Sequence, residues 1–424
     1  MLQVAHIQED YQTILESLEK RGFPEAAATL DRVLALDKER RETQFQLDSI
    51  KAESNKLSKE IGMLFKSGKK EEAEAAKAKT GELKEQSKDL GEKLSSAEQT
   101  LKDTLYTIPN KLHPSVPAGS AAEDNEEVHA HGTPPTLHEG AKPHWDLIKD
   151  LDIIDFELGV KITGAGFPVY KGKGARMQRA LVNFFLDQAI EAGYAEVQPP
   201  HVVNEASGYG TGQLPDKEGQ MYELVDEKLF LIPTAEVPIT NMYRDVIVDG
   251  TSLPIKNVGY TPCFRREAGS WGAHVRGLNR LHQFDKVEIV QVRKPAESYE
   301  ALEEMCAHVE GLLQKLELPY RVLRLCGGDI GFTSALTYDM EVYSAAQERW
   351  LEVSSVSNFE TYQSNRLKLR HRTGDKQTEL LHTLNGSALA LPRILASILE
   401  NNQTPEGIRV PEVLVPYTGF SMID

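Results

Sequence analysis

Apolar residues recur at helical spacing in a highly charged stretch near the start of the chain. Between Ala26 and Leu105 the sequence is rich in Ala, Glu, Lys, Leu and Gln and contains no proline. It breaks once, at Phe65–Ala73, which predicts two long helices joined by a tight turn. At ~1.5 Å per residue each helix would extend about 55 Å, more than a compact domain needs. We therefore predict an antiparallel coiled-coil arm within a helical region of residues 1–107.

Each helix of this arm has an apolar seam. In the second helix the seam positions follow steps of seven, four and three, which keeps them on one side of the helix. The first helix offers partners for them. The seam residues are Leu83, Leu90, Leu94, Ala97, Leu101 and Leu105 in the second helix, and Leu30, Leu34, Phe45, Leu57, Ile61 and Leu64 in the first.

The rest of the chain has a different pattern. Residues 108–135 are rich in proline, glycine and acidic side chains, which predicts a linker. From residue 136 to 424 strand-like segments alternate with turns and with few helices, so we predict an antiparallel sheet in an α+β domain and not a doubly wound parallel fold. The expected strands include Lys228–Thr240, Tyr320–Gly328, Thr337–Ser344 and Arg349–Phe359, and the expected helices are about Gly174–Ala192, Ser298–Leu316 and Ala388–Asn401.

Composition narrows the class of protein. The 424 residues include 48 basic and 64 acidic side chains, a formal charge of −16, which argues against a protein that coats nucleic acid non-specifically but leaves room for a local basic patch. The 3 cysteines are widely spaced and suggest neither a disulfide framework nor a metal site. The charged N-terminus lacks a signal-peptide core, and no run of about 18 apolar residues occurs. We expect a cytoplasmic protein with no membrane partner.

The hairpin from Thr261 to Val290 carries polar side chains near the end of its first strand. Arg265 can bind a phosphate through charge-assisted hydrogen bonds. Glu267 would project from the same face and accept a bond from an exocyclic amine, while Phe284 on the returning strand offers a ring for a base to stack on. The pattern fits a nucleotide site, and the alternative is a surface hairpin with solvated ion pairs. The long connection, with Gly269, Gly272, His274, Arg276 and Gly277, would form a mobile flap over the ligand.

Three motifs occur in the order that class II aminoacyl-tRNA synthetases have. The segment Arg179–Pro200, a helix leading to a strand with prolines at its end, loosely resembles their first motif. The sequences FRRE and HQFDKVE in the hairpin resemble the second, and NGSALALPR with Arg393 resembles the third. Together with TAEVPIT, EVSSVSNFETYQSNR and the N-terminal helical hairpin, these motifs make the whole chain resemble the bacterial-type seryl-tRNA synthetases.

The resemblance implies an ATP site. Arg265 would contact the α-phosphate and the substrate carboxylate, and Arg393 would reach the γ-phosphate, which makes these two the catalytic arginines. Glu267 would bind the adenine amine, while the Leu281 backbone and Phe284 would contact the base. The full set of expected ATP-binding residues is Arg265, Arg266, Glu267, Leu281, Phe284, Glu352, Val353, Ser354, Ser355 and Arg393.

The resemblance also implies a metal site and a serine pocket. Glu352 and Ser355 match positions that hold Mg²⁺, which prefers hard oxygen ligands and shares them with phosphate; by pattern alone this segment would be an edge strand with surface serines. Glu236 would bind the substrate ammonium, although it could equally be an ion-paired sheet residue. The expected serine-binding residues are Thr234, Ala235, Glu236, Arg265, Glu288 and Ser387.

The arm has basic side chains that could contact phosphates. They are Lys66, Lys69 and Lys70 at the turn and Arg40, Arg41, Lys51 and Lys56 along the first helix. In the family this arm recognises the long variable arm of serine tRNA, so the resemblance implies tRNA(Ser) as a partner, tRNA(Sec) as an expected second one, and a homodimer. The pattern alone would also fit a coiled coil that serves dimerisation or spacing.

The implied reaction forms seryl-adenylate from L-serine and ATP and then transfers the seryl group to tRNA. Three residues depart from common bacterial patterns: Val356, Ala388 and Pro392. None removes a reacting group, but Ala388 and Pro392 could shift the start of the last helix and hence Arg393. Two other classes remain open. An enzyme that loads a carrier protein would lack the long arm, and a non-catalytic paralogue would be expected to lose Arg265, Glu267 or Arg393.

Overall fold

A computed structural model describes residues 1–216, 219–268, 275–374 and 377–424 of the chain. The chain divides into two compact units. One unit contains Leu2–Glu19 and Phe23–Pro109; the other contains Met1, Lys20–Gly22 and Asn110–Asp424. Within the described residues, no helix combines the length and the apolar character needed to cross a membrane.

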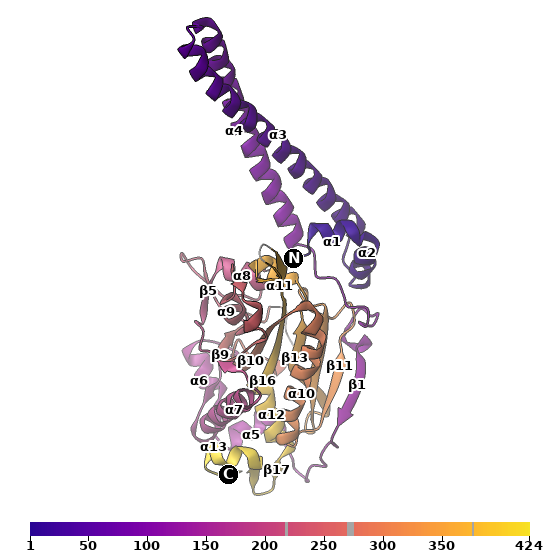
Figure 1. Ribbon diagram of the computed structural model, residues 1–424. Coiled ribbons are helices and arrows are strands. Elements are labelled where there is room, and N and C mark those ends of the chain that lie inside the picture. The colour runs from indigo at the N-terminus through magenta and orange to yellow at the C-terminus, as the bar shows by residue number, and fades with distance from the viewer. Residues whose placement is uncertain (217–218, 269–274, 375–376) are drawn as a thin grey trace. The chain divides into compact units, whose positions relative to one another are not determined.

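The first unit contains the predicted coiled-coil arm, shown in Figure 1. Helices α1 (Val4–Glu9) and α2 (Tyr11–Lys20) precede two long helices, α3 (Ala26–Lys66) and α4 (Lys70–Tyr106), which pack along each other. Ion pairs Lys79–Glu53 (2.7 Å) and Lys93–Glu39 (3.4 Å) join the long helices. The step from Lys79 to Lys93 equals the step from Glu53 back to Glu39, so both pairs share one antiparallel register.

Six of the predicted seam residues are buried, five (Leu34, Leu57, Ile61, Leu64 and Leu90) are half-buried, and one is exposed. Leu30, Leu83, Leu94 and Leu105 are buried. Phe45 was predicted in the seam but is 74% exposed. Thr43 and Leu47 are the buried residues here, and a residue two positions from each of them points to the opposite side of a helix. The seam prediction for Phe45 was therefore wrong.

The second unit is built on an antiparallel sheet, as predicted. Its strand order in the described chain is β1-β11-β12-β13-β16-β10-β9-β4, and only the short β4–β9 pair is parallel. The sequence-adjacent hairpin β9–β10 lies next to β16, which joins it to β13. The strands are β1 (Glu126–His131), β4 (Ala195–Glu196), β9 (Ile255–Phe264), β10 (Gln283–Arg293), β11 (Tyr320–Arg324), β12 (Leu336–Ser344), β13 (Arg349–Asn358) and β16 (His382–Ala390).

Helices cover this sheet and pack a large hydrophobic core against it, and smaller clusters lie beside this core. Helix α7 (Gly172–Glu191) buries Met177, Leu181, Phe184 and Phe185, and it contacts β9 and β10. Helices α10 (Ser298–Lys315) and α12 (Leu391–Asn401) also pack on the sheet (Figure 1). Shorter helices are α5 (His144–Asp150), α6 (Phe156–Ile162), α8 (Glu205–Thr211), α11 (Tyr362–Leu367) and α13 (Val415–Thr418).

Two segment predictions were wrong in detail. Lys228–Thr240 was expected to be a strand, but β7 covers Leu229–Leu231 and helix α9 covers Glu236–Asn241. Alternating apolar residues suggested the strand, yet Pro238 cannot donate to a sheet and is tolerated in the first turn of a helix. Residues 388–390, assigned to the last helix, instead end β16.

The stretch predicted as a linker also contributes structure. Residues 126–131 form β1, which pairs antiparallel with β11 at the edge of the sheet. All six side chains of β1 are exposed, so its polar composition resembles that of a loop. Pairing across the sheet, which is a tertiary interaction, makes this segment a strand.

Candidate active site

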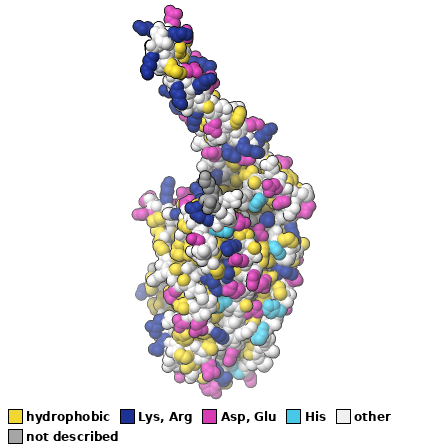
Figure 2. Space-filling view, in the orientation of Figure 1, with side chains coloured by type: hydrophobic (Ala, Val, Ile, Leu, Met, Phe, Trp, Pro, Cys, Tyr) yellow, Lys and Arg dark blue, Asp and Glu magenta, His cyan; other side chains and the backbone are white. Residues whose placement is uncertain are grey.

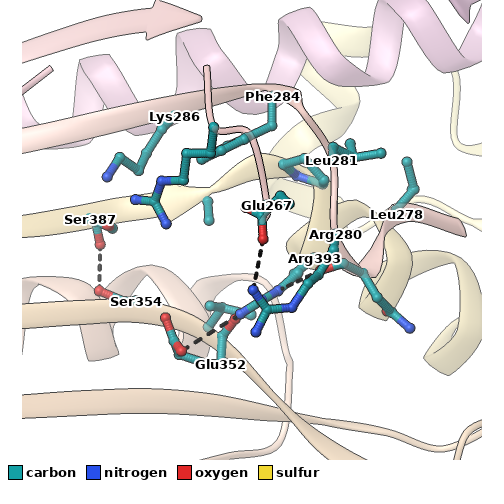
Figure 3. A pocket seen from close by; sticks show the side chains of 15 residues that line it. Glu267, Leu278, Arg280, Leu281, Phe284, Lys286, Glu352, Ser354, Ser387 and Arg393 are labelled. Carbon is teal, nitrogen blue, oxygen red and sulfur yellow. Dashed lines mark hydrogen bonds and ion pairs between the residues drawn. The ribbon is translucent and has the colours of Figure 1, made fainter. Parts of the chain in front are cut away.

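A cavity lies where β9 and β16 end and β10 begins, next to residues 352–354 of β13 and the start of α12; it and the solvent at its mouth occupy about 690 Å³. Figure 3 shows the side chains around it. Nine of the predicted site residues line this cavity: Arg265, Glu267, Leu281, Phe284, Glu352, Val353, Ser354, Ser387 and Arg393. The lining also includes Leu278, Asn279, Arg280, Lys286, Ala390 and Pro392, which the sequence analysis did not select.

Arg265 lies one residue beyond β9. Its backbone N–H donates to His282 O at 2.9 Å, and its Nε donates to Pro233 O at 3.3 Å. The guanidinium lies over the ring of Phe284, with 5.3 Å between Cζ and the ring centroid. The hairpin therefore holds a cation and an aromatic ring together at the cavity, as the nucleotide interpretation requires.

Glu267 was expected to project from the same strand face as Arg265, but β9 ends at Phe264 and Glu267 reaches the cavity from the turn that follows. Its φ is 49°, in the left-handed region that few residues other than glycine adopt. Its carboxylate accepts a hydrogen bond from Arg280 Nη1 at 2.8 Å (Figure 3). Arg266 N donates to Gln220 O at 2.9 Å, and Arg266 is not among the described residues that line the cavity.

Of the predicted flap, Gly269, Gly272 and His274 lie outside the described residues. The described end of this segment lies against α5. Arg276 Cζ is 4.9 Å from the centroid of the Trp145 ring.

Arg393 lies in the first turn of α12. Its Nε donates to Asn279 O at 3.0 Å, and its Nη1 donates to Glu352 O at 2.6 Å. Pro392 also lies in this first turn, where a missing N–H leaves no helical bond unmade. The helix thus begins with a proline without losing the arginine from the cavity.

Val356, another departure, is fully buried against Gly386, and a Cβ at residue 386 would lie 3.2 Å from it. This small apolar side chain therefore packs in the core and is not among the described residues that line the cavity.

The two predicted metal ligands differ in their surroundings. The Glu352 carboxylate lines the cavity and lies 3.8 Å from Arg393 Nη1. Ser355 does not line it and hydrogen-bonds to Asp339, whose pKa is raised well above its usual range by burial and by the nearby charge of Glu352. The described residues contain no group of three or more His, Cys, Asp or Glu that could hold a metal ion. A metal here would have to take most of its ligands from a bound substrate.

A buried polar network lies beside the cavity. Glu236 accepts hydrogen bonds from Gln363 Nε2 at 2.6 Å and from Asn385 Nδ2 at 3.1 Å. Asn385 Nδ2 also donates to Glu288 at 2.7 Å, and Lys286 Nζ lies 2.9 Å from Glu288. Since Lys286 lines the cavity, this network reaches from Glu236 to the cavity wall.

The other predicted serine-binding residues join the same network. Ser387 Oγ donates to Glu288 at 3.5 Å, and Thr234 Oγ1 accepts from Glu236 N at 3.3 Å. Ala235 is fully buried. The sequence analysis missed Gln363, Asn385 and Lys286, although all three fall within the quoted motifs. Nothing in a single motif indicated that their side chains would meet.

Burial changes the acidity of Glu236. Removal from water raises its pKa to about 7, and the charge of Glu288 adds to the increase. The hydrogen bond from Gln363 and the charges of Lys286 and Arg265 oppose it. A carboxylate near neutrality, buried next to a second carboxylate, favours a cationic ligand.

Comparisons with known proteins agree with this geometry. Residues 1–112 match the protein-family model of the seryl-tRNA synthetase N-terminal domain, and residues 221–402 match that of the tRNA synthetase class II core domain (G, H, P, S and T). The serine–tRNA ligase of Salinibacter ruber is 49% identical over 100% of this chain and 99% of its own length. That of Alkaliphilus oremlandii is 48% identical over 98% of each.

Solved structures are similar over the same span. Seryl-tRNA synthetase from Pyrococcus horikoshii, complexed with ATP, has a TM-score of 0.92 and 35% identity, covering 100% of this chain and 99% of the other. The cytoplasmic serine–tRNA ligase of Naegleria fowleri, in complex with AMP, has a TM-score of 0.86 and 28% identity over 100% and 99%.

Proposed function

The chain belongs to the seryl-tRNA synthetase family, and we propose that its cavity binds ATP and L-serine side by side. The observation that carries this proposal is the meeting of two different environments. Arg265, Glu267, Phe284 and Arg393 form a cationic and aromatic end, and the Glu236–Glu288 network forms a buried acidic end.

At the nucleotide end, Arg265 and Arg393 would bind phosphates as bidentate cations. Phe284 would stack on the base, Glu267 would accept from its amine, and Leu281 would contact it through the backbone. Glu352 and Ser355 would be the residues that hold Mg²⁺, which would neutralise negative charge on the phosphates. Arg266 remains a proposed ATP ligand, one that would have to turn toward the cavity.

At the acidic end, Glu236 would pair with the substrate ammonium, and Glu288 and Ser387 would face its hydroxyl. Arg265 would then contact the substrate carboxylate from the nucleotide end. Thr234 and Ala235 would form the wall behind the ammonium, since they precede Glu236 and are buried with it. The pocket would thereby hold each polar group of serine.

The reaction would proceed in two steps. The serine carboxylate oxygen attacks the α-phosphorus of ATP, and pyrophosphate leaves with the electron pair of the broken P–O bond. Arg265 and Arg393 stabilise the negative charge that spreads over the phosphates. A terminal ribose hydroxyl of tRNA then attacks the seryl carbonyl, and AMP leaves. No side chain becomes covalently bound, so positioning and electrostatics account for the rate.

The arm, residues 1–107, would bind tRNA(Ser) through its basic side chains, while residues 136–424 carry out the chemistry. Figure 2 shows Lys and Arg side chains gathered over the far end of the arm, where Lys66, Lys69 and Lys70 are exposed. We extend this proposal to tRNA(Sec), to a homodimer and to a cytoplasmic location. Exposed apolar side chains on α6, Val160 (57%) and Ile162 (72%), support a subunit interface.

The test is pyrophosphate exchange with each of the twenty amino acids, followed by charging of tRNA(Ser) and tRNA(Sec) transcripts. Exchange that depends on serine and Mg²⁺, with charging of tRNA(Ser), is the expected result. Exchange without tRNA charging would indicate an enzyme that loads another acceptor, and no exchange would contradict the proposal. Sedimentation of the full chain tests the dimer.

A further inference from the structure

Glu400 is a buried carboxylate at the far end of α12 from Arg393. Its side chain is 0% exposed. It accepts hydrogen bonds from His144 N at 2.8 Å, His144 Nδ1 at 2.6 Å and Gln347 Nε2 at 2.9 Å, and from the Ser344 hydroxyl. Among the described residues no Lys or Arg forms an ion pair with it. A buried carboxylate whose partners carry no formal positive charge lowers the stability of the fold. A functional role would account for its presence.

His144 is neutral in this arrangement. Its Nε2 accepts the backbone N–H of Leu278 at 2.8 Å, and because a backbone N–H can only donate, Nε2 must carry a lone pair. The ring proton is therefore on Nδ1, which donates to Glu400. The Glu400 carboxylate accepts from His144 N, His144 Nδ1, Gln347 Nε2 and the Ser344 hydroxyl, so its surroundings supply the donors that an ionised carboxylate needs. The ionised carboxylate thus selects the tautomer that can accept from Leu278.

This pair is linked to the cavity through the short 3₁₀ helix η4 (Gly277–Asn279). Leu278 and Asn279 line the cavity, as do Arg280 and Leu281, which follow. In Figure 3, Leu278, Arg280 and Leu281 lie on the same side of the cavity as Arg393. Leu278 N–H, which is bonded to His144, therefore sets the position of one wall of the nucleotide end.

A second link runs in parallel. Asn279 Nδ2 donates to Gln347 Oε1 at 2.9 Å, and Gln347 Nε2 donates to Glu400. The carbonyl of Asn279 accepts from Arg393 Nε at 3.0 Å. Both ends of α12 are thus tied to η4: Arg393 directly at its start, and Glu400 through His144 and Gln347 at its end.

The η4 backbone packs tightly against the His144 ring. Gly277 has a φ of +67°, and a Cβ there would lie 2.3 Å from His144 Nε2. A side chain at residue 277 would displace the imidazole ring, so the ring and the η4 backbone are in direct contact.

We propose that His144 and Glu400 are a buried positioning pair that holds η4 against Arg393 and so sets the nucleotide end of the cavity for ATP. Neither residue is among those that line the cavity in the described chain. The proposal rests on the proposed function, because it assumes that ATP binds in this cavity. It predicts that loss of the His144–Leu278 bond weakens ATP binding and leaves serine binding unchanged, since the Glu236–Glu288 network makes no contact with the pair.

The experiment compares two substitutions of His144, each of which keeps one of its two hydrogen bonds. His144→Asn keeps a donor near Nδ1 for Glu400 but leaves the Leu278 N–H without an acceptor. His144→Gln places an amide oxygen near Nε2 and restores that acceptor. In serine-dependent pyrophosphate exchange, H144N should raise the KM for ATP about tenfold, equivalent to about 1.4 kcal/mol, with the KM for serine within twofold. H144Q should recover most of this loss.

His382→Asn is the matched control. His382 is a buried histidine whose Nδ1 is 2.7 Å from Ser298 Oγ, at the opposite end of β16 from the cavity. Tm and the active fraction are measured for every form. H382N should lower Tm without changing the KM for ATP. Wild-type exchange with serine is measured first, because its absence would contradict the proposed function and not the role of the pair.

Two outcomes would overturn the positioning role. One is a lowered Tm and active fraction in H144N with the KM for ATP changed less than twofold, which would make the pair merely structural. The other is an equal rise in both KM values. If H144N does not fold, Glu400→Leu decides, because it keeps a similar volume but removes the oxygen that accepts from His144 Nδ1. A selective rise in the KM for ATP supports the proposal, and an unchanged KM contradicts it.

Discussion

In the arm most charged side chains lie on the surface, with Asp37 as a buried exception, whereas several are buried in the catalytic unit. The Lys79–Glu53 pair of the arm is 56% and 45% exposed. The Lys286–Glu288 pair beside the cavity is 7% and 0% exposed. Exposed pairs contribute about 0–1 kcal/mol because water and salt screen them, while removing one partner of a buried pair costs about 3–5 kcal/mol.

The difference has a functional consequence. An exposed rod with many charges can contact a long polyanion through many small contributions, so no single side chain dominates. A buried network can distinguish one small molecule from another, because each unpaired group there is costly. We therefore expect changes in the arm to act on tRNA and single changes around the cavity to act on activation.

The largest expected effect comes from removing the arm, which should affect tRNA charging and not serine activation. Replacing Ala26–Leu105 with a short Gly/Ser linker should abolish tRNA charging, because the basic side chains of the arm are lost. Serine-dependent pyrophosphate exchange should stay within a fewfold of the intact chain, since no cavity residue is removed. Equal loss of both activities, in a form with an unchanged Tm for the catalytic unit, would contradict this division.

Arg265→Ala should reduce pyrophosphate exchange about 10²- to 10³-fold, the size of effect seen when one preorganised donor to a transition state is removed. Arg266→Ala is the matched control, because Arg266 does not line the cavity among the described residues. Its exchange rate should fall much less. Similar losses in both variants would mean that the two arginines share the role.

Glu288→Gln should lower kcat/KM for serine about 10- to 100-fold, since a charge-assisted buried hydrogen bond is worth about 1.5–3 kcal/mol. A site that pairs with a substrate hydroxyl leaves polar groups unpaired when alanine enters, so wild type should reject alanine more strongly than threonine. The variant should narrow the serine-to-alanine ratio in exchange assays. An unchanged ratio would leave Glu288 with a structural role.

The pKa of Glu236, about 7, predicts a pH dependence. A protonated Glu236 cannot pair with an ammonium, so kcat/KM for serine should fall about fivefold from pH 7 to pH 6 and level off well above neutrality. In Glu288→Gln the inflection should move to lower pH, because a neighbouring negative charge is gone. An inflection that stays in place would remove Glu236 from this role.

Folding stability should respond to pH with the opposite sign. Because burial raises the pKa of Glu236 from its ordinary value of 4.5 to about 7, the native state binds more protons than the unfolded state between these two pH values. The contribution of Glu236 to stability is therefore fully present below about 4.5 and is lost as pH rises through about 7. Urea titrations of wild type and Glu236→Gln across this range measure the difference.

The smallest expected effect is in the arm. Lys66→Ala and Lys70→Ala should each raise the KM for tRNA only a fewfold and reduce its dependence on salt, because each removes one screened phosphate contact. Glu74→Ala, a change at another exposed charged position of α4, should not raise it. If replacing either lysine reduced charging as much as removing the whole arm does, tRNA binding by the arm would not consist of many small contributions.

The sequence by itself determined the features that depend on neighbouring residues. The arm helices, α7 and α10 appear within a few residues of their predicted bounds, because a 3.6-residue period is a property of consecutive positions. The antiparallel class of the sheet follows from the turns between its strands. The motifs also identified nine residues that line the cavity. For several of them the residue pattern alone left a structural role equally open, and the resemblance to the family favoured the functional one.

Only the tertiary structure decided which side chains meet. The bonds Asn385–Glu288 and His144–Glu400 join residues 97 and 256 positions apart. Such partners depend on strand register and on how α12 packs, and neither leaves a local period in the sequence. The same holds for β1, whose polar residues become a strand by pairing with β11, and for α9, where Pro238 favours a helical turn within a strand-like pattern. Local periodicity reports how a segment can fold, while the partners of a buried polar group are set by the whole chain.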